Sequence, residues 1–272
     1  MPLETDDWAH EVGVTTSSFM NQITADPATS EFSVFDLPRI MRDELGMRII
    51  DLNTNTLGSL EMAHVDHFRN EVEKAGCIVT NLKLNQFDVD MSSPDAETRS
   101  HALDVYRKSV DVAAILGARW VRPHPRQNRP DMDLHIAGYR ALVEYASVRG
   151  LQVIVENYGW MSTDVDGTPE LIAAVDRDLR TGPDTGSWAS NDVRYPGLER
   201  IFPLAVTCDY KAFVLGADGE HEDYDLHRCF AIGRDAGFRG PWCIEHWNSD
   251  WPALRRELKF LRDRIGEWSQ AD

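Results

Sequence analysis

The sequence is poor in cysteine and contains no long apolar run. Its cysteines, Cys77, Cys208, Cys229 and Cys243, form no C-x-x-C pair, which argues against a thiolate metal site and predicts core residues in a reducing compartment. No run reaches the roughly 20 apolar residues that span a membrane. The first ten residues, MPLETDDWAH, lack the apolar stretch of a signal peptide. We therefore expect a cytoplasmic protein without a membrane partner.

Basic residues are also scarce. The chain has 28 Lys and Arg against 45 Asp and Glu, which gives a formal net charge of −17 at pH 7. A charge of this sign repels phosphate backbones and anionic membrane surfaces over long range. Nucleic acid is therefore not an expected partner.

Glycine-rich phosphate loops are a third absence. No G-x-G-x-x-G or G-x-x-x-x-G-K-[ST] element follows the first predicted strand, so a Rossmann or P-loop fold has no support. Glycine instead marks the ends of helices. Five helix-period segments end in a glycine and run directly into a short apolar segment, which is typical of a helix, its C-cap and a strand. These glycines are Gly46, Gly76, Gly117, Gly150 and Gly237.

Predicted strands and helices alternate along the whole chain. Strands are expected near residues 12–16, 47–52, 77–84, 118–123, 151–156, 180–184, 204–210 and 241–245. Helices are expected near residues 33–45, 60–75, 95–116, 132–149, 168–178, 194–201, 222–237 and 251–266. This alternation implies a parallel sheet, and eight units in 272 residues predict an α/β fold, a single-domain (β/α)8 TIM barrel. Residues 1–10 and 268–272 are expected at its periphery.

The sixth predicted strand, 180–184, departs from the apolar character of the others. It is polar and carries Gly182 and Pro183 directly before Asp184. Proline is tolerated at a strand end or at a bulge, so we expect an irregular strand here.

Four acidic residues each stand at the end of an apolar or strand-like run. Glu156 closes LQVIVE, Asp184 opens DTGSW, Asp209 ends LAVTCD and Glu245 ends PWCIE, at separations of 28, 25 and 36 residues. A carboxylate at the end of a buried strand is costly unless a cation or a proton compensates it. Because the carboxyl ends of barrel strands meet at the active-site face, we expect these four side chains to surround one divalent cation.

The residue types at this predicted site indicate which metal it holds. Oxygen ligands, without cysteine and without an obvious histidine, favour a hard cation, Mn²⁺ first and Mg²⁺ second. The alternative is that some of these acids cap helices or form ion pairs just past the strand ends, Asp209 above all. Alternation places Lys211 on the face of Asp209, where its ammonium group can partly neutralise a crowded acidic site.

Further side chains near the strand ends are candidates for binding a substrate. Arg122 and His124, in RWVRPHP, suit a hydroxyl, phosphate or carboxylate group, and a surface ion pair with a loop histidine is the alternative. Tryptophans follow three of the acids, and their apolar faces with one N–H donor suit a polyol, ordinary loop packing being the alternative. The remaining candidates are Trp160, Trp188, Trp247 and His246, the last of which alternation turns outward.

The order of several segments resembles the xylose-isomerase-like TIM-barrel family. These segments are VIVENYGW, DTGSW, VTCDYK, GADGEHEDYD and GFRGPWCIEHW. The family includes sugar and sugar-phosphate isomerases and epimerases, inosose dehydratases and relatives of endonuclease IV. Its patterns are a Glu ending strand five, a D-x-G-N turn, an H-x-K on strand seven, a G-x-G-E-[IV]-D-[YF] loop and a final I-E. The resemblance spans roughly residues 10 to 266 and is specific from about 150 to 247.

The resemblance implies roles for individual residues. It implies metal ligands at Glu156, Asp184 and Glu245, with Asp209 where the family usually has histidine and Ser187 where its turn has asparagine. Glu156 and Glu245 would flank the substrate carbon and exchange its proton, each as both ligand and acid or base. The implied reaction is a metal-dependent isomerisation or epimerisation of a sugar or keto-sugar through an enediolate, in a protein that is commonly a dimer or tetramer.

Three other functions use the same fold. A lyase or dehydratase would abstract the same proton and then eliminate a group β to the carbonyl of a keto-sugar or keto-glycoside. A non-catalytic barrel subunit would have lost its metal. An apurinic-site endonuclease is disfavoured, because such nucleases need a histidine-rich zinc cluster that this acidic chain does not offer.

Overall fold

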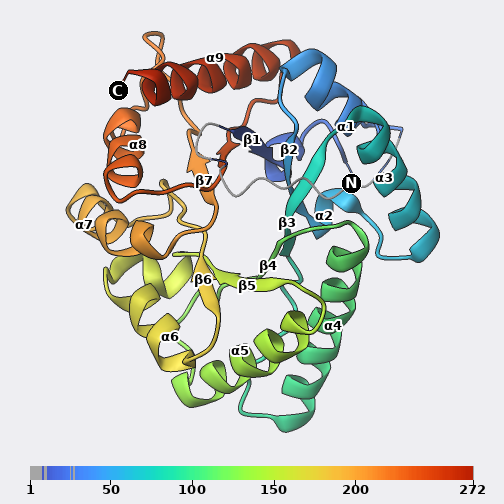
Figure 1. The fold of residues 1–272 in the computed structure, drawn as a ribbon, viewed down its shortest axis with the longest axis vertical. Coiled ribbons are helices and arrows are strands. Elements are labelled where there is room, and N and C mark those ends of the chain that lie inside the picture. The colour runs from blue at the N-terminus through green and yellow to red at the C-terminus, as the bar shows by residue number, and fades with distance from the viewer. Residues whose placement is uncertain (1–7, 9–10, 25, 27, 272) are drawn as a thin grey trace.

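The computed structural model describes residues 8, 11–24, 26 and 28–271, and its centre is one parallel sheet of eight strands curled into a barrel (Figure 1). The strands are β1 Val12–Thr15, β2 Ile49–Asn53, β3 Ile78–Leu84, β4 Trp120–Pro123, β5 Gln152–Val155, β6 Leu179–Thr181, β7 Cys208–Lys211 and β8 Trp242–Glu245. Their order is β6-β5-β4-β3-β2-β1-β8-β7, so β6 and β7 are the two edges that closure must join. The predicted α/β TIM barrel is confirmed.

Helices surround the barrel on its outside (Figure 1). They are α1 Leu37–Arg39, which continues as a π-helical turn to Leu45, α2 Thr54–Leu57, α3 Met62–Ala75, α4 Ala96–Ile115, α5 Met132–Ser147, α6 Gly167–Val175, α7 Asn191–Ile201, α8 Leu226–Asp235 and α9 Trp251–Gln270. The predicted periphery at 1–10 lies outside the described residues except for Trp8. At the other end of the chain, α9 continues to Gln270, and Trp268 packs against Phe230 of α8.

The glycines predicted to end helices adopt the left-handed conformation that this role requires. The φ angles of Gly46, Gly76, Gly117, Gly150 and Gly237 lie between +67° and +75°. This region costs glycine nothing but strains other L-residues. At Gly76 a Cβ atom would meet no other atom within 4 Å, so the conformation alone explains the glycine there.

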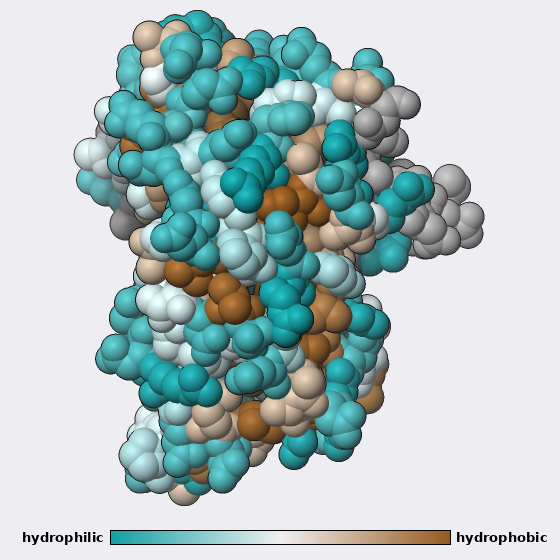
Figure 2. All heavy atoms as spheres, turned by 90° about the vertical axis from the view of Figure 1, so that its left-hand side faces the viewer, coloured by the Kyte–Doolittle hydropathy of each residue, from teal (hydrophilic) through white to brown (hydrophobic). Residues whose placement is uncertain are grey.

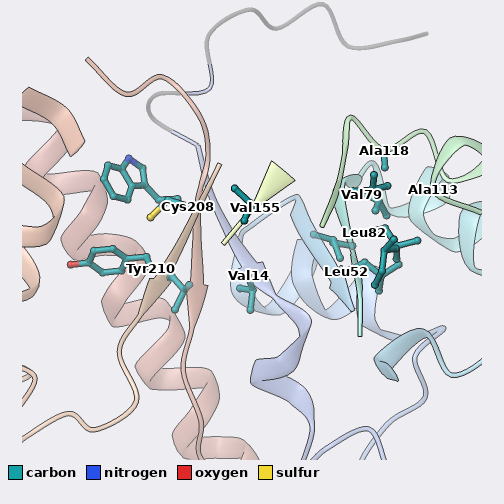
Figure 3. Packing of buried hydrophobic residues seen from close by; sticks show 14 of the residues in the cluster. Val14, Leu52, Val79, Leu82, Ala113, Ala118, Val155, Cys208 and Tyr210 are labelled. Atoms are coloured by element: carbon teal, nitrogen blue, oxygen red, sulfur yellow. The ribbon is translucent and has the colours of Figure 1, made fainter. Parts of the chain in front are cut away.

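The apolar core lies between the strands and the surrounding helices. Val79 and Leu82 of β3 are buried on the side of Ala113 of α4, whereas Tyr210 of β7 belongs to the opposite wall (Figure 3). Val79 and Leu82 share a face although three positions separate them. A register shift after Ile50 in β2 accounts for this, since it inserts one extra residue into β3 and so turns Asn81 and Lys83 inward.

The sheet closes between β6 and β7 through single bridges instead of a regular ladder. Thr181 pairs with Ala205 and Asp184 with Asp209, both in parallel orientation. Pro183 has no N–H group, but its carbonyl oxygen accepts a hydrogen bond from the Asp209 N–H at 2.8 Å. The irregular sixth strand of the sequence is thus the closing seam of the barrel, and it sets two of the four predicted acids side by side.

The face that carries α7 and α8 is mostly hydrophilic and has small separate apolar patches (Figure 2). None of the helices in the described part of the chain combines the length and apolar character that a membrane crossing requires. Cys77, Cys208, Cys229 and Cys243 are free thiols buried in the core, as the sequence predicts.

Candidate metal and acid–base site

Three of the four predicted acids lie at the carboxyl ends of their strands, whereas Asp209, which the sequence predicts to end its strand, is the second residue of β7. Glu156 follows β5, Asp184 follows β6, Asp209 lies within β7 and Glu245 ends β8. Their exposed fractions are 6%, 0%, 4% and 8%. All four are therefore removed from bulk water, where an uncompensated carboxylate is costly.

Three of these acids form one compact group. One carboxylate oxygen from each of Glu156, Asp184 and Asp209 lies within 4.8 Å of the other two. Glu245 lies outside this group, and its carboxylate is engaged by Ser17 Oγ at 3.0 Å and by Lys211 Nζ at 3.4 Å. The structure therefore brings together three of the four predicted ligands and keeps the fourth next to them, across Lys211.

Each acid of the compact group also has its own buried cationic partner. Arg122 Nε lies 3.0 Å from Glu156 Oε2, although the angle is too poor for a hydrogen bond. Lys211 Nζ lies 2.7 Å from Asp184 Oδ2. Lys83 Nζ lies 2.6 Å from Asp209 Oδ1 and 3.4 Å from Asp51 Oδ2. The interior is thus a network of alternating charges, not a bare acidic pocket.

The network does not balance its own charge. Five carboxylates, those of the four predicted acids and Asp51, face three cationic side chains, those of Lys83, Arg122 and Lys211. With all groups ionised, five negative and three positive charges leave a formal charge of −2. One divalent cation, or protons on two of the acids, would neutralise this excess.

The pKa values of the three clustered acids shift in different directions. Burial raises the pKa of Glu156 to about 7, although Arg122 opposes the shift. Burial raises the pKa of Asp209 to about 8 against the opposing effect of Lys83. Asp184 is equally buried, but Lys211 and hydrogen bonds from Ser187 outweigh burial and hold its pKa below the ordinary value. Burial also raises the pKa of Asp51, so it favours the protonated forms of Glu156, Asp209 and Asp51.

The donor set fits a hard divalent cation. Three carboxylates with ligand oxygens within 4.8 Å, no thiolate among them and an excess charge of −2 suit Mg²⁺ or Mn²⁺. Asp184 carries the main constraint: its Oδ1 accepts the N–H groups of Gly186 and Ser187, and its Oδ2 accepts Ser187 Oγ and Lys211 Nζ. An ion could therefore bind Asp184 Oδ2 only if the Lys211 ammonium group moved away from it. Glu245, at 3.4 Å, is the other carboxylate that this ammonium group contacts.

A cavity of about 590 Å³ adjoins this network on the side of β6 and β7. Ser187 and Lys211, which both contact Asp184, form part of its lining, together with Trp188 and Arg194. The space suffices for a small molecule of sugar size. A further cavity lined by Glu11 and Arg48 contains no part of the acidic network.

Arg122, Lys211 and His124 all lie at the site end of the barrel. Arg122 and Lys211 join the charge network directly. His124, just past β4, contacts the rings of Phe87 and Tyr158 at centroid distances of 4.5 and 5.6 Å. Burial and the nearby Arg122 lower the pKa of His124 to about 4, so it is a neutral imidazole at pH 7.

The predicted tryptophans occupy three different environments. Trp188 is buried against Gly197 of α7 and lines the cavity. Trp160 packs in its loop beneath Arg129, whose guanidinium carbon lies 4.9 Å from the ring. Trp247 is partly exposed and stacks on Phe213 at 4.0 Å. Trp188 is the one that the structure places at the cavity wall.

His246 turns away from the network. Its Nδ1 contacts the carbonyl oxygen of Ala212, and its Nε2 lies 2.8 Å from Glu257 of α9. Both ring nitrogens are thus occupied on the outer side of β8, as strand alternation predicts for the residue after Glu245.

Sequence reasoning missed Lys83 and Asp51. The signal was present, because Asp51 with Asn53 and Asn81 with Lys83 are polar residues two positions apart in otherwise apolar strands. Polar residues with this spacing face one side of a strand, here the barrel interior. The same alternation did identify Lys211 on β7.

The sequence matches the family model described as xylose isomerase-like TIM barrel over residues 43–264. The chain belongs to this family. No curated protein matches the sequence. Membership agrees with the resemblance that the segments from Glu156 to Glu245 carry, and it makes an enzyme the expected kind of protein.

Several solved structures share the fold at low sequence identity. A D-psicose 3-epimerase with D-tagatose from Clostridium cellulolyticum H10 has a TM-score of 0.72 and 13% identity over 95% of this chain and 98% of that one. A xylose isomerase-like TIM barrel protein from Mycobacterium smegmatis in complex with magnesium has a TM-score of 0.68 and 18% identity over 96% of this chain and 98% of that one. A probable 3-DHS dehydratase from Bacillus anthracis has a TM-score of 0.70 and 15% identity over 93% of this chain and 99% of that one. At these identities the likeness shows the fold.

Proposed function

We propose that this protein is a divalent-metal-dependent isomerase or epimerase of a sugar or keto-sugar. The single observation that carries the proposal is the compact group of Glu156 and Asp184, which follow β5 and β6, with Asp209 of β7. The adjoining cavity and the excess charge of −2 support it. The bound D-tagatose and magnesium named for two neighbours of the same fold agree with this class of substrate and cofactor.

The three clustered acids would hold the ion, with Mn²⁺ preferred and Mg²⁺ as the alternative. When bound, a dication of this kind polarises a substrate carbonyl and makes the neighbouring C–H acidic. The chain itself supplies the proton acceptor. Glu156, whose pKa burial raises to about 7, can receive a proton near neutral pH, and the charge of Arg122 stays at 3.0 Å in either state.

Glu245 is proposed as the second acid or base. It lies near the group but outside it, and Ser17 orients one of its oxygens at 3.0 Å. Lys211 stands between Asp184 and Glu245, at 2.7 and 3.4 Å. Its ammonium group can therefore move towards Glu245 when an ion takes Asp184 Oδ2. The predicted ligation of the metal by Glu245 would need its carboxylate to move into the group.

A lyase or dehydratase is the second candidate, favoured by the structural likeness to a probable 3-DHS dehydratase. Elimination begins with the same proton transfer to Glu156 or Glu245, and the leaving group then departs from the β carbon. The two reactions therefore place the same demand on these carboxylates and differ in the group that the cavity must release.

A panel of ketoses and 3-keto glycosides, incubated with the purified protein and Mn²⁺, tests the proposal. Isomerisation conserves the mass of the substrate and moves a proton, which NMR in D₂O detects at the exchanged carbon. Elimination releases water or an aglycone and lowers the mass. A protein that binds Mn²⁺ stoichiometrically but changes none of the panel would contradict the sugar proposal. One that binds no metal would favour the non-catalytic barrel.

A further inference from the structure

The most deeply buried cation of the barrel has no assigned role. Lys83 enters the interior from β3 and crosses it to reach Asp209 on β7. Its side chain is 4% exposed, against 11% for Lys211. Lys83 is thus buried more deeply than Lys211 and, unlike Lys211, does not line the cavity of about 590 Å³.

Oxygen atoms surround the Lys83 ammonium group as they would a small cation. Thr15 Oγ1 and Asp209 Oδ1 both lie at 2.6 Å, and Asp51 Oδ2 lies at 3.4 Å. These oxygens come from three different strands, β1, β2 and β7. The ammonium group thus links the acidic group to Asp51, which is fully buried and whose Oδ2 has no hydrogen-bond partner, so that Lys83 is its charge partner.

We propose that Lys83 is a positioning residue, a built-in counter-ion that fixes Asp209 for ligation and limits how tightly the acidic group holds a divalent cation. This inference rests on the proposed metal site. Its physical basis is charge: an ammonium group at 2.6 Å from a ligand carboxylate lowers the affinity of that carboxylate for a second cation. Without Lys83, the interior would carry a formal charge of −3.

Calorimetric titration of the chelator-treated protein with Mn²⁺ alone tests this role. Lys83→Met keeps the length of the side chain and removes its charge, and we expect Mn²⁺ to bind roughly tenfold more tightly. Asp51→Asn has the opposite effect on the local charge, and we expect binding roughly tenfold weaker. The double variant should return close to the wild-type affinity. Lys74→Met, which removes an exposed lysine of α3, controls for net charge and should leave the affinity unchanged.

The outcomes separate this inference from the proposed function. A Lys83→Met protein that melts earlier but binds Mn²⁺ with wild-type or lower affinity would show a merely structural lysine, and the metal site would stand. A wild type that binds no Mn²⁺ beside a Lys83→Met variant that does would overturn the proposed function and support the inference. If Lys83→Met does not fold, unchanged Mn²⁺ affinity in Asp51→Asn overturns the inference. If neither the wild type nor any variant binds Mn²⁺, both the inference and the proposed function are overturned.

Discussion

The two halves of the barrel interior carry opposite charges. The β5 to β8 half supplies four acids, Glu156, Asp184, Asp209 and Glu245, and one cation, Lys211, whereas the β2 to β4 strands supply two cations, Lys83 and Arg122, and one acid, Asp51. Each half alone would bury uncompensated charge, at a cost of several kcal/mol per ion. Together they form ion pairs at 2.6 to 3.0 Å and leave only the excess of negative charge that a divalent cation can satisfy. Under the proposed function, the acids of the β5 to β8 half would bind the cation and exchange the proton, and the cations of β3 and β4 would set how strongly these acids bind it.

The largest effect is expected from the acidic half. Glu245→Gln keeps the shape of the side chain but cannot exchange a proton, so turnover should fall by about 10²–10⁴-fold with the fold intact. Glu199→Gln, on the exposed side of α7, is the matched control and should keep full activity. Rates on the converted substrate, beside circular dichroism, check both. Near-native activity of Glu245→Gln would remove this residue from its role.

A ligand exchange within the acidic half is expected to preserve metal binding. Asp209→His places an imidazole where the family usually has one, so Mn²⁺ should still bind, whereas Asp209→Ala should lose it. The change to histidine also leaves Lys83 without its carboxylate at 2.6 Å, and the affinity should therefore fall below that of wild type. Calorimetry measures all three proteins. An Asp209→His variant that lost the ion would argue against equivalence with the family histidine.

The two faces of β3 offer a direct contrast between packing and charge. Leu82 is fully buried on the helix side, next to the inward-facing Lys83. Leu82→Ala should lower the free energy of unfolding by about 2–5 kcal/mol, because it leaves a cavity among well-packed neighbours. Mn²⁺ affinity should not change. Urea unfolding and Mn²⁺ titration of the same variant test this, and a large change in affinity would contradict the separation of the two faces.

The raised pKa values make a prediction about pH for the metal-free protein. Burial raises the pKa of Glu156 to about 7 and that of Asp209 to about 8, so the folded state binds protons that the unfolded state has released. Their stabilising contribution is complete below about pH 4 and is lost as the pH rises through 7 and 8. The melting temperature in EDTA should therefore fall between pH 7 and 8, and saturating Mn²⁺ should reduce the slope.

Above pH 7 the buried histidines no longer change the stability in the opposite direction. Burial lowers the pKa of His124 and of His135 to about 4, and these groups favour the folded state more as the pH rises to about 6.5. Thermal melts in EDTA at quarter-unit steps from pH 7 to 8 measure the slope, below the range in which cysteine thiols of the unfolded state ionise. A melting temperature that stays level or rises there would mean that the two carboxylates are already ionised.

The smallest effect concerns a helix end remote from the site. Gly76 holds a φ of +67° with free space around it, so Gly76→Ala should cost about 1 kcal/mol of stability through conformation alone. Urea unfolding measures the loss, which should leave Mn²⁺ affinity untouched. A loss above about 3 kcal/mol would mean that an unrecognised contact is broken.

The sequence predicts the fold well because its signals are local. Glycines such as Gly117 and Gly150 end helices by their own conformational freedom, and each apolar run after them becomes a strand. The acids at the strand ends were also visible, since a carboxylate there breaks an apolar run. The pairing of Lys83 with Asp209 was not, because 126 residues separate them and only closure of the barrel brings them together.

Crystals soaked in Mn²⁺, with anomalous data collected near the manganese edge, test the central claim most directly. We predict one anomalous peak bound by Glu156, Asp184 and Asp209, with the Lys83 ammonium group still between Asp51 and Asp209. A barrel without a peak at saturating Mn²⁺, or with its peak away from these three carboxylates, would contradict the metal site and the reaction that depends on it.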